Sequence, residues 1–155
     1  MTVHFTDEDL IDHDAVAAVI RDEDRNVLML QHAKWGFWSI PIGKAHSGQA
    51  PLEGLREEMR EELGIEVRKA SEIASAVVRY TEGRDVLLRF HVYEIEEFEG
   101  MVENREPQKH RGLEYFALDD LATLDRLSDA TVLFLESQGL TPKAAWSGAV
   151  VADGR

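Results

Sequence analysis

Carboxylates at helical spacing are the residues of this sequence that can most directly do chemistry. They lie in the segment Arg56-Glu-Glu-Met-Arg-Glu-Glu-Leu-Gly-Ile65. At roughly 3.6 residues per turn, Glu58, Glu61 and Glu62 fall on one face of a helix. Such a face has two interpretations: it is a solvated acidic surface, or it is a set of ligands for a cation.

Two features of the glutamate run favour a cation. Glu57/Glu61 and Glu58/Glu62 are like-charged pairs four residues apart, and each pair costs roughly 0.2–0.5 kcal/mol without a counter-ion. Acidic residues near the C-terminal end of a helix are also disfavoured by its macrodipole. All-oxygen ligation suits Mg²⁺ or Mn²⁺ rather than zinc. The sequence therefore predicts a divalent-cation site on this helix, with the solvated face as the alternative.

The helix itself is expected from residue 51 to residue 63. Pro51 suits a first helical position, and Gly64 suits the residue just past the end. The apolar residues of the segment fall on a face adjacent to the glutamates, where they can dock on a sheet. They are Leu52, Leu55, Met59 and Leu63.

Two β-hairpins are predicted around this helix. Residues 14–20 and 27–31 are apolar runs joined by a short charged turn, which is typical of a hairpin. Residues 75–80 and 86–95 are rich in β-forming side chains and flank a second turn. The two hairpins would supply most of a sheet on which the helix packs.

The C-terminal part adds a strand and two helices. Residues 113–118 form a further short strand, and Asp119-Asp120 cap a short helix. A longer helix is expected over residues 125–137. Residues 141–155 are rich in small side chains and are expected to be a loose tail, although residues 149–152 can pair with an exposed edge. The order β-β-β-α-β-β-β-α indicates an α/β fold with a mixed sheet between helices.

Composition narrows the function classes. The chain has 155 residues, a formal net charge of −13 and no cysteine, which fits one domain in a reducing compartment. The acidic balance argues against nucleic acid and anionic membranes as partners, and no apolar run has the length of a membrane span. We therefore expect a cytoplasmic protein. Small anionic substrates stay open, because bound cations can reverse the local field.

The segment from Gly43 to Ile65 resembles the Nudix box, G-x5-E-x7-R-E-U-x-E-E-x-G-U, where U is an apolar residue. Gly43 matches the first glycine, and the second half matches in register at Glu58, Met59, Glu61, Glu62, Gly64 and Ile65. The lead-in from Trp38 to Lys44 resembles the family's W-x-x-P-G-G-K approach. The resemblance implies a Nudix-type α/β/α sandwich, with residues 1–140 as the hydrolase domain.

The box has two departures and one variation. Gln49 and Glu57 stand where the family has a glutamate and an arginine that pair with each other. Both have changed together, which predicts a Gln–Glu hydrogen bond in place of the ion pair; rescue by Arg56 is the alternative. Ile42 replaces a common glycine, but its backbone carbonyl can still be a metal ligand. The three metal-face carboxylates are all present.

The resemblance also implies roles for the site residues. Glu61 and Glu62 would hold the cation, and Glu58 would either join them or orient the attacking water as a base. Lys44 is placed to meet a phosphate, with an exposed loop lysine as the alternative. The family often adds an acidic ligand from outside the box, for which the sequence offers Glu94, Glu96, Glu97 and Glu106.

A second resemblance concerns the substrate. Residues 98–116 look like the G-x-x-x-N-x-E-P-x-K segment of family members that act on nucleoside triphosphates, with Asn104, Glu106 and Lys109 among the matching residues. Trp38 and its aromatic neighbours can stack on a base. The resulting hypothesis is hydrolysis of a (deoxy)nucleoside triphosphate to monophosphate and pyrophosphate, with Mg²⁺ (or Mn²⁺) as cofactor.

Other functions stay open at this point. ADP-ribose, a nucleotide sugar or a dinucleoside polyphosphate are alternative substrates. A Nudix-like module that senses a nucleotide without cleaving it is an alternative of another class, motivated by the changed pair at Gln49 and Glu57. The partner in every case is a small nucleotide, and a homodimer is the default assembly.

Overall fold

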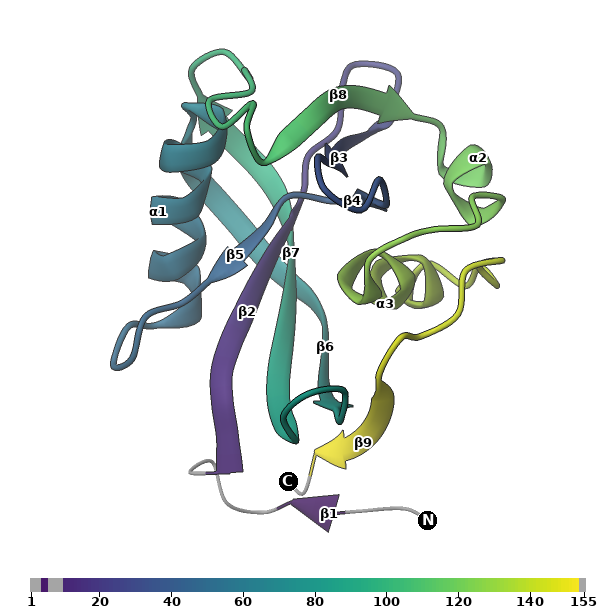
Figure 1. Cartoon of the computed structure of the whole chain (residues 1–155). Coiled ribbons are helices and arrows are strands. Elements are labelled where there is room, and N and C mark those ends of the chain that lie inside the picture. Colours follow the sequence, from purple (N-terminus) through teal and green to yellow (C-terminus); the bar gives the residue numbers. More distant parts are fainter. Residues whose placement is uncertain (1–3, 6–9, 154–155) are drawn as a thin grey trace.

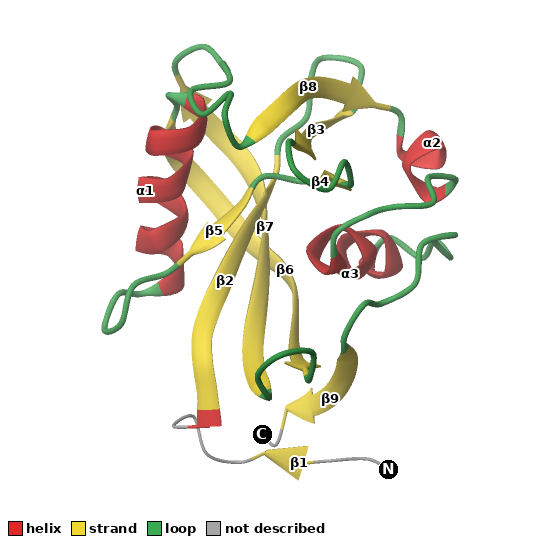
Figure 2. Ribbon diagram, viewed as in Figure 1, coloured by secondary structure: helices red, strands yellow, loops and turns green. Residues whose placement is uncertain are grey.

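The structure is a computed structural model that describes residues 4–5 and 10–153, which form two β-sheets with helices against them (Figures 1 and 2). The strands are β1 (His4–Phe5), β2 (Ile11–Val19), β3 (Val27–His32), β4 (Trp38–Ser39), β5 (Ile42–Lys44), β6 (Glu66–Tyr80), β7 (Val86–Glu99), β8 (His110–Phe116) and β9 (Ala149–Asp153). The helices are α1 (Pro51–Leu63), α2 (Leu118–Ala122) and α3 (Asp129–Ser137). The larger sheet has the order β1-β9-β6-β7-β2-β5, and the smaller one β4-β3-β8.

The larger sheet is mixed and lies between α1 and α3 (Figure 1). Strand β2, which is second from the edge, pairs in parallel with β7 and antiparallel with the edge strand β5. Because successive side chains of a strand point to opposite faces, Val16 and Ala18 pack in the core under α1, while Ala17 and Val19 pack in the core under α3. The expected mixed sheet between helices is confirmed.

The first predicted hairpin is confirmed at its turn but not along its strands. β3 does not continue the sheet of β2 but pairs with β4 and β8 in the smaller sheet. Next to the turn, the two segments are linked by an antiparallel bridge between Arg21 and Val27 and by the Leu28 N–H, which donates to the Ile20 carbonyl (2.9 Å). The physical reason is that β2 is apolar on both faces, which places it in the middle of a sheet, where β7 and β5 already occupy its two edges.

The second predicted hairpin is confirmed, and it is longer than expected. β6 and β7 pair antiparallel along almost their whole length, from Glu66 opposite Glu99 to Tyr80 opposite Val86. β6 begins two residues after Gly64, so the C-terminal end of α1 is tied directly to the sheet. This connection fixes the height of the glutamate helix above the strands.

Helix α1 forms where the sequence predicts it. Pro51 stands in its first turn, and Gly64 ends it in the left-handed conformation (φ 72°), donating its backbone N–H to the Arg60 carbonyl. Leu55 and Met59 are fully buried against the sheet with the other apolar residues of this face. Among the described residues, no helix has the length and apolar character of a membrane span.

The C-terminal region differs from expectation in three ways. The N-cap of α2 is Ala117, without a side-chain cap, so Asp119 and Asp120 lie in the first turn instead of capping the helix. α3 starts at Asp129 rather than near residue 125, because the Ser128 hydroxyl accepts a hydrogen bond from the Thr131 N–H (3.2 Å) and caps the helix there. Residues 149–153, part of the segment expected to be a loose tail, form β9, which pairs antiparallel with β6 and parallel with β1. The alternative of edge pairing is the one that the structure shows.

Candidate active site

Gly43 and Glu58 face each other across the contact between β5 and α1. A side chain at residue 43 would overlap the Cγ, the Cδ and a carboxylate oxygen of Glu58. The first glycine of the box is therefore required because the Glu58 carboxylate lies directly on the β5 backbone. The Ile42 carbonyl belongs to the peptide that joins Ile42 to Gly43, and its role as a metal ligand stays a prediction.

Glu62 is the most deeply buried side chain of the glutamate cluster, which consists of Glu58, Glu61 and Glu62 of α1. It is only 5% exposed, and its Oε2 has no hydrogen-bond partner in the described part of the chain. Burial, followed by the charges of Glu58 and Glu106, raises the pKa of Glu62 to about 8. Burial and then the charge of Glu61 also raise the pKa of Glu58. Glu61 itself is exposed at the rim of the cluster.

Glu106 is the acidic residue from outside the box that the fold brings to this place, since its charge acts on both Glu58 and Glu62. The other candidates lie on β7. Glu94 pairs with Arg21 (3.2 Å), and Glu96 pairs with Lys69 (3.2 Å); Glu97 is exposed opposite Lys69.

The loop that carries Glu106 is held against the end of α1 by backbone hydrogen bonds. The N–H of Arg105 donates to the Glu62 carbonyl (2.9 Å), and the N–H of Glu103 donates to the Leu63 carbonyl (3.1 Å). Gly64 allows this approach, because a Cβ there would lie 2.5 Å from Nε of Arg105. The second glycine of the box therefore ends the helix and makes room for the loop.

Asn104 and Lys109 shape and charge this loop. Nδ2 of Asn104 donates to the His110 carbonyl (2.7 Å), and its Oδ1 accepts from the Glu106 N–H (3.2 Å). Lys109 pairs with Glu106 (3.1 Å), and the hydrogen bond to that carboxylate raises the Lys109 pKa, with smaller contributions from Glu62 and Glu58. Asn104 thus orders the loop, whereas Lys109 is the cation beside the glutamates.

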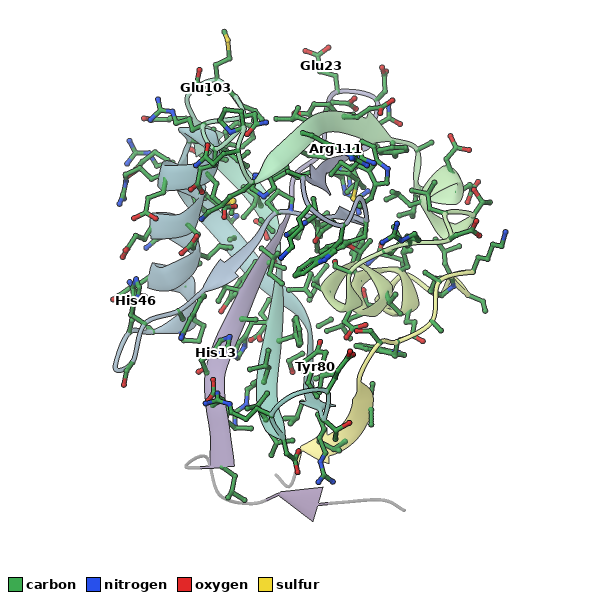
Figure 3. The ribbon with its side chains drawn as sticks, viewed as in Figure 1. His13, Glu23, His46, Tyr80, Glu103 and Arg111 are labelled. Carbon is green, nitrogen blue, oxygen red and sulfur yellow. The ribbon has the colours of Figure 1, made fainter. Side chains whose placement is uncertain are left out.

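The predicted Gln–Glu contact is confirmed. Nε2 of Gln49 donates to Oε2 of Glu57 (2.9 Å), and Oε1 of Gln49 accepts from the His46 N–H (2.9 Å). The His46 ring lies 3.4 Å from the other Glu57 oxygen; Figure 3 shows His46 in the loop that leads into α1. Glu57, not Arg56, therefore holds this loop. We call the contact between Gln49 and Glu57 the brace.

The donor set fits a hard divalent cation. The converging groups are carboxylates, and Glu62 has a buried oxygen without a partner, which suits oxygen-ligated Mg²⁺ or Mn²⁺. Within residues 4–5 and 10–153, however, no three His, Cys, Asp or Glu side chains already stand at the spacing of a closed metal site. A cation would therefore have to draw the carboxylates together.

Lys44 and Trp38 lie apart from the glutamates. Lys44 is exposed at the end of β5, lines a separate cavity of about 510 Å³, and contributes to lowering the pKa of Asp12, behind the His13 hydrogen bond and the Arg84 charge. Trp38 packs edge-on against Phe116, with ring centroids 5.0 Å apart. Their predicted contacts with a substrate stay predictions.

A second cavity, of about 700 Å³, lies on the opposite side of β5 from the glutamates. Its lining includes Phe37, Ile42, Tyr80, Phe90, Leu127 and Ala144. Because side chains alternate along a strand, Ile42 points into this cavity while Gly43 meets Glu58. Since β5 is an edge strand, an extended ligand can reach from the cavity around it to the glutamates.

The exposed aromatic residue near this cavity is already engaged. Trp35 is 56% exposed and stacks on His32 (4.9 Å), which also stacks on Phe37 (4.8 Å). Sequence reasoning missed two other residues of the lining, Tyr80 and Asp129. They lie 49 residues apart, and no spacing rule joins them.

Comparison with known proteins decides the family. The family model for the NUDIX domain matches residues 12–135, which is most of the chain. The chain belongs to the Nudix family. It is a MutT-like Nudix hydrolase, and members of this family use divalent cations. The matched range contains the glutamate helix, the loop with Glu106 and most of α3.

Individual relatives agree with this assignment. The chain is 30% identical over 97 residues to a CTP pyrophosphohydrolase of Escherichia coli (strain K12), covering 60% of this chain and 70% of that protein. It is 43% identical over 54 residues to the 8-oxo-dGDP phosphatase NUDT18 of Danio rerio, which is 33% of this chain but only 17% of that protein. A MutT NUDIX hydrolase from Burkholderia pseudomallei superposes with a TM-score of 0.71 at 27% identity, covering 81% of this chain and 96% of that one.

Proposed function

We propose that this Nudix hydrolase cleaves nucleoside triphosphates, or their deoxy forms, to the monophosphate and pyrophosphate with Mg²⁺, and that Mn²⁺ can replace it. The observation that carries the proposal is the buried Glu62 carboxylate, which lacks a partner and is surrounded by the charges of Glu58, Glu61 and Glu106. Such a cluster disfavours its own ionised state unless a cation compensates it.

Each glutamate has a distinct place in this proposal. Glu62 holds the cation from the buried side and Glu61 from the exposed rim, and Glu106 completes the acidic set from its loop. Glu58, fixed against Gly43, holds the cation together with the Ile42 carbonyl and accepts the proton of the attacking water. The chemistry that a bound divalent cation supplies is neutralisation of phosphate charge and a lower pKa for that water.

Lysine side chains and the larger cavity complete the substrate site. Lys109, already beside Glu106, balances phosphate charge, and Lys44 meets the phosphate that extends furthest along β5. The base lies in the 700 Å³ cavity on the other side of β5, next to aromatic side chains such as Phe37 and Phe90 that line it. Support for a nucleotide comes from the relatives, whose names refer to CTP and 8-oxo-dGDP.

The test is hydrolysis of a nucleotide panel by the purified chain with Mg²⁺. The panel contains the ribo- and deoxynucleoside triphosphates, 8-oxo-dGTP, ADP-ribose, a nucleotide sugar and a dinucleoside polyphosphate. Phosphate is measured with and without added inorganic pyrophosphatase, so that pyrophosphate release is seen as a signal that depends on the added enzyme. We expect a triphosphate to give the highest kcat/KM and a pyrophosphatase-dependent signal.

Variants link the activity to the cluster. Glu58→Gln and Glu62→Gln should each lower kcat at least a hundredfold. Glu53→Gln is the matched control, because Glu53 is an exposed glutamate in the first turn of the same helix, and it should keep wild-type activity. Full activity in Glu62→Gln would refute the proposed site. Tight nucleotide binding without turnover of any panel member would instead indicate the sensing module.

A further inference from the structure

The segment between α3 and β9 forms one wall of the larger cavity. We call residues 140–148 the C-terminal strap; it leaves the end of α3 and crosses to the edge of the large sheet (Figure 1). Ala144, Ala145 and Ser147 line the cavity from this side. The backbone N–H of Lys143 donates to the Ala122 carbonyl (2.8 Å), and Ala144 is only 6% exposed. The strap is therefore packed in place.

A buried carboxylate fastens the strap to the rest of the cavity wall. Asp129 is 5% exposed and accepts three hydrogen bonds. The donors are the Tyr80 hydroxyl (2.5 Å), the Ser147 backbone N–H (2.7 Å) and the Ser147 hydroxyl (2.7 Å). We call these contacts the latch; they join β6, α3 and the strap, and Figure 3 shows Tyr80 below α3 at the end of β6.

The latch uses the hydrogen-bonding capacity of Asp129 for the strap. Three donors from Tyr80 and Ser147 occupy its two oxygens, so this buried carboxylate holds the strap against β6 and α3. Burial, followed by the hydrogen bond to Asp129, raises the Tyr80 pKa far above its usual range, so Tyr80 remains a donor at all working pH values. A buried carboxylate that loses a donor is penalised, which makes the strap position well defined.

Small side chains along the strap keep the cavity open. A Cβ at Gly148 would lie 2.6 Å from Cγ1 of Val78 and 2.8 Å from the Arg79 carbonyl, so the chain can enter β9 at this height only through glycine. The preceding lining residues are two alanines and a serine. The strap thus borders the cavity with backbone and short side chains. The latch fixes where the strap lies relative to the other lining residues, such as Phe37 and Phe90.

We propose that the C-terminal strap is the wall that selects the base of the nucleotide, and that Asp129, Tyr80 and Ser147 are the residues that position it. This inference rests on the proposed function, since it assigns the 700 Å³ cavity to the base. The strap would distinguish flat heterocyclic bases by their size. Discrimination between purine and pyrimidine nucleotides therefore depends on the strap.

The first experiment narrows the cavity from the strap. Ala145 is exposed and lines the cavity, so Ala145→Phe adds a ring there without touching the latch. We expect KM for purine triphosphates to rise at least tenfold and KM for pyrimidine triphosphates to rise less than threefold, with kcat within twofold of wild type. Thr141→Phe is the control, because Thr141 is exposed on the strap outside the cavity lining.

The second experiment loosens the latch. Ser147→Ala and Tyr80→Phe each remove a hydroxyl while keeping the rest of the side chain, so one remains informative if the other fails to fold. Each should raise KM three- to tenfold and reduce the purine-to-pyrimidine ratio of kcat/KM at least threefold, while kcat stays within twofold. Ser71→Ala is the control; it removes one hydrogen bond from β6, to Glu96, far from the cavity.

Calorimetric binding of the triphosphates with Ca²⁺ in place of Mg²⁺ separates the two proposals. If the wild type binds nucleotides but hydrolyses none, the proposed function fails, and the strap is judged on binding alone with the same fold-changes in Kd. If Ala145→Phe and both latch variants bind and discriminate like wild type, or if the wild type binds no nucleotide, the inference is overturned.

Discussion

The brace gives a prediction whose size can be worked out from the structure. Gln49→Glu keeps the oxygen that accepts from the His46 N–H. It replaces the amide nitrogen, which lies 2.9 Å from Oε2 of Glu57, with a carboxylate oxygen that cannot donate. The lost hydrogen bond to a charged acceptor contributes about 1.5–3 kcal/mol at most. Glu57 is about one-third exposed, so the added repulsion is modest, about 1 kcal/mol at relaxed distance.

We therefore expect Gln49→Glu to lower the free energy of unfolding by about 2.5–4 kcal/mol and Tm by roughly 5–15 °C. Because the brace holds the loop between β5 and α1, kcat should fall as well. Adding Glu57→Arg creates an ion pair of the kind typical of the family and should recover most of the loss. Denaturant unfolding of the two single variants and the double variant measures the coupling between the two positions.

A charge control makes this test specific. Ser47→Glu adds the same charge to the same exposed loop without facing Glu57, and it should change the free energy of unfolding by less than about 0.5 kcal/mol. The reasoning is refuted if Ser47→Glu is as harmful as Gln49→Glu. It is equally refuted if the effects of Gln49→Glu and Glu57→Arg simply add, since the two side chains then do not interact.

Three further predictions concern the glutamate cluster. Without divalent cations, the free energy of unfolding should fall by about 3 kcal/mol as pH rises from about 5 to 8. The reason is that the folded chain keeps the Glu62 proton up to about pH 8, while the unfolded chain releases it near 4.5. Glu62→Gln should largely remove this pH dependence in denaturant titrations. Gly43→Ala should lower kcat at least tenfold by displacing Glu58, whereas Gly48→Ala, which has open space despite its φ of 80°, should change stability but not kcat. Glu106→Gln should reduce the thermal shift produced by Mg²⁺ at least by half, and an unchanged shift would exclude this residue as a ligand.

Local pattern, together with the resemblance to the Nudix box, predicted much of the site. The register from Gly43 to Gly64 identified α1, its buried face and its three carboxylates, because a helix converts sequence spacing directly into geometry. The paired change at Gln49 and Glu57 likewise predicted a contact that the structure contains. The β6–β7 hairpin was predictable for the same reason, since a short turn forces its two strands together.

Contacts between distant parts of the chain required the tertiary structure. The sequence could not choose Glu106 from four acidic residues, because its position depends on a loop bonded to the end of α1. Sequence reasoning also paired β2 with β3 beyond their turn, because strand partners depend on which strand is buried on both faces. It also left the C-terminal segment loose, although Asp129 is the anchor of a packed strap. Helical spacing therefore determined which carboxylates share a face, whereas the packing of the chain decided which distant residues lie beside them, because no local periodicity encodes contacts that the core brings together.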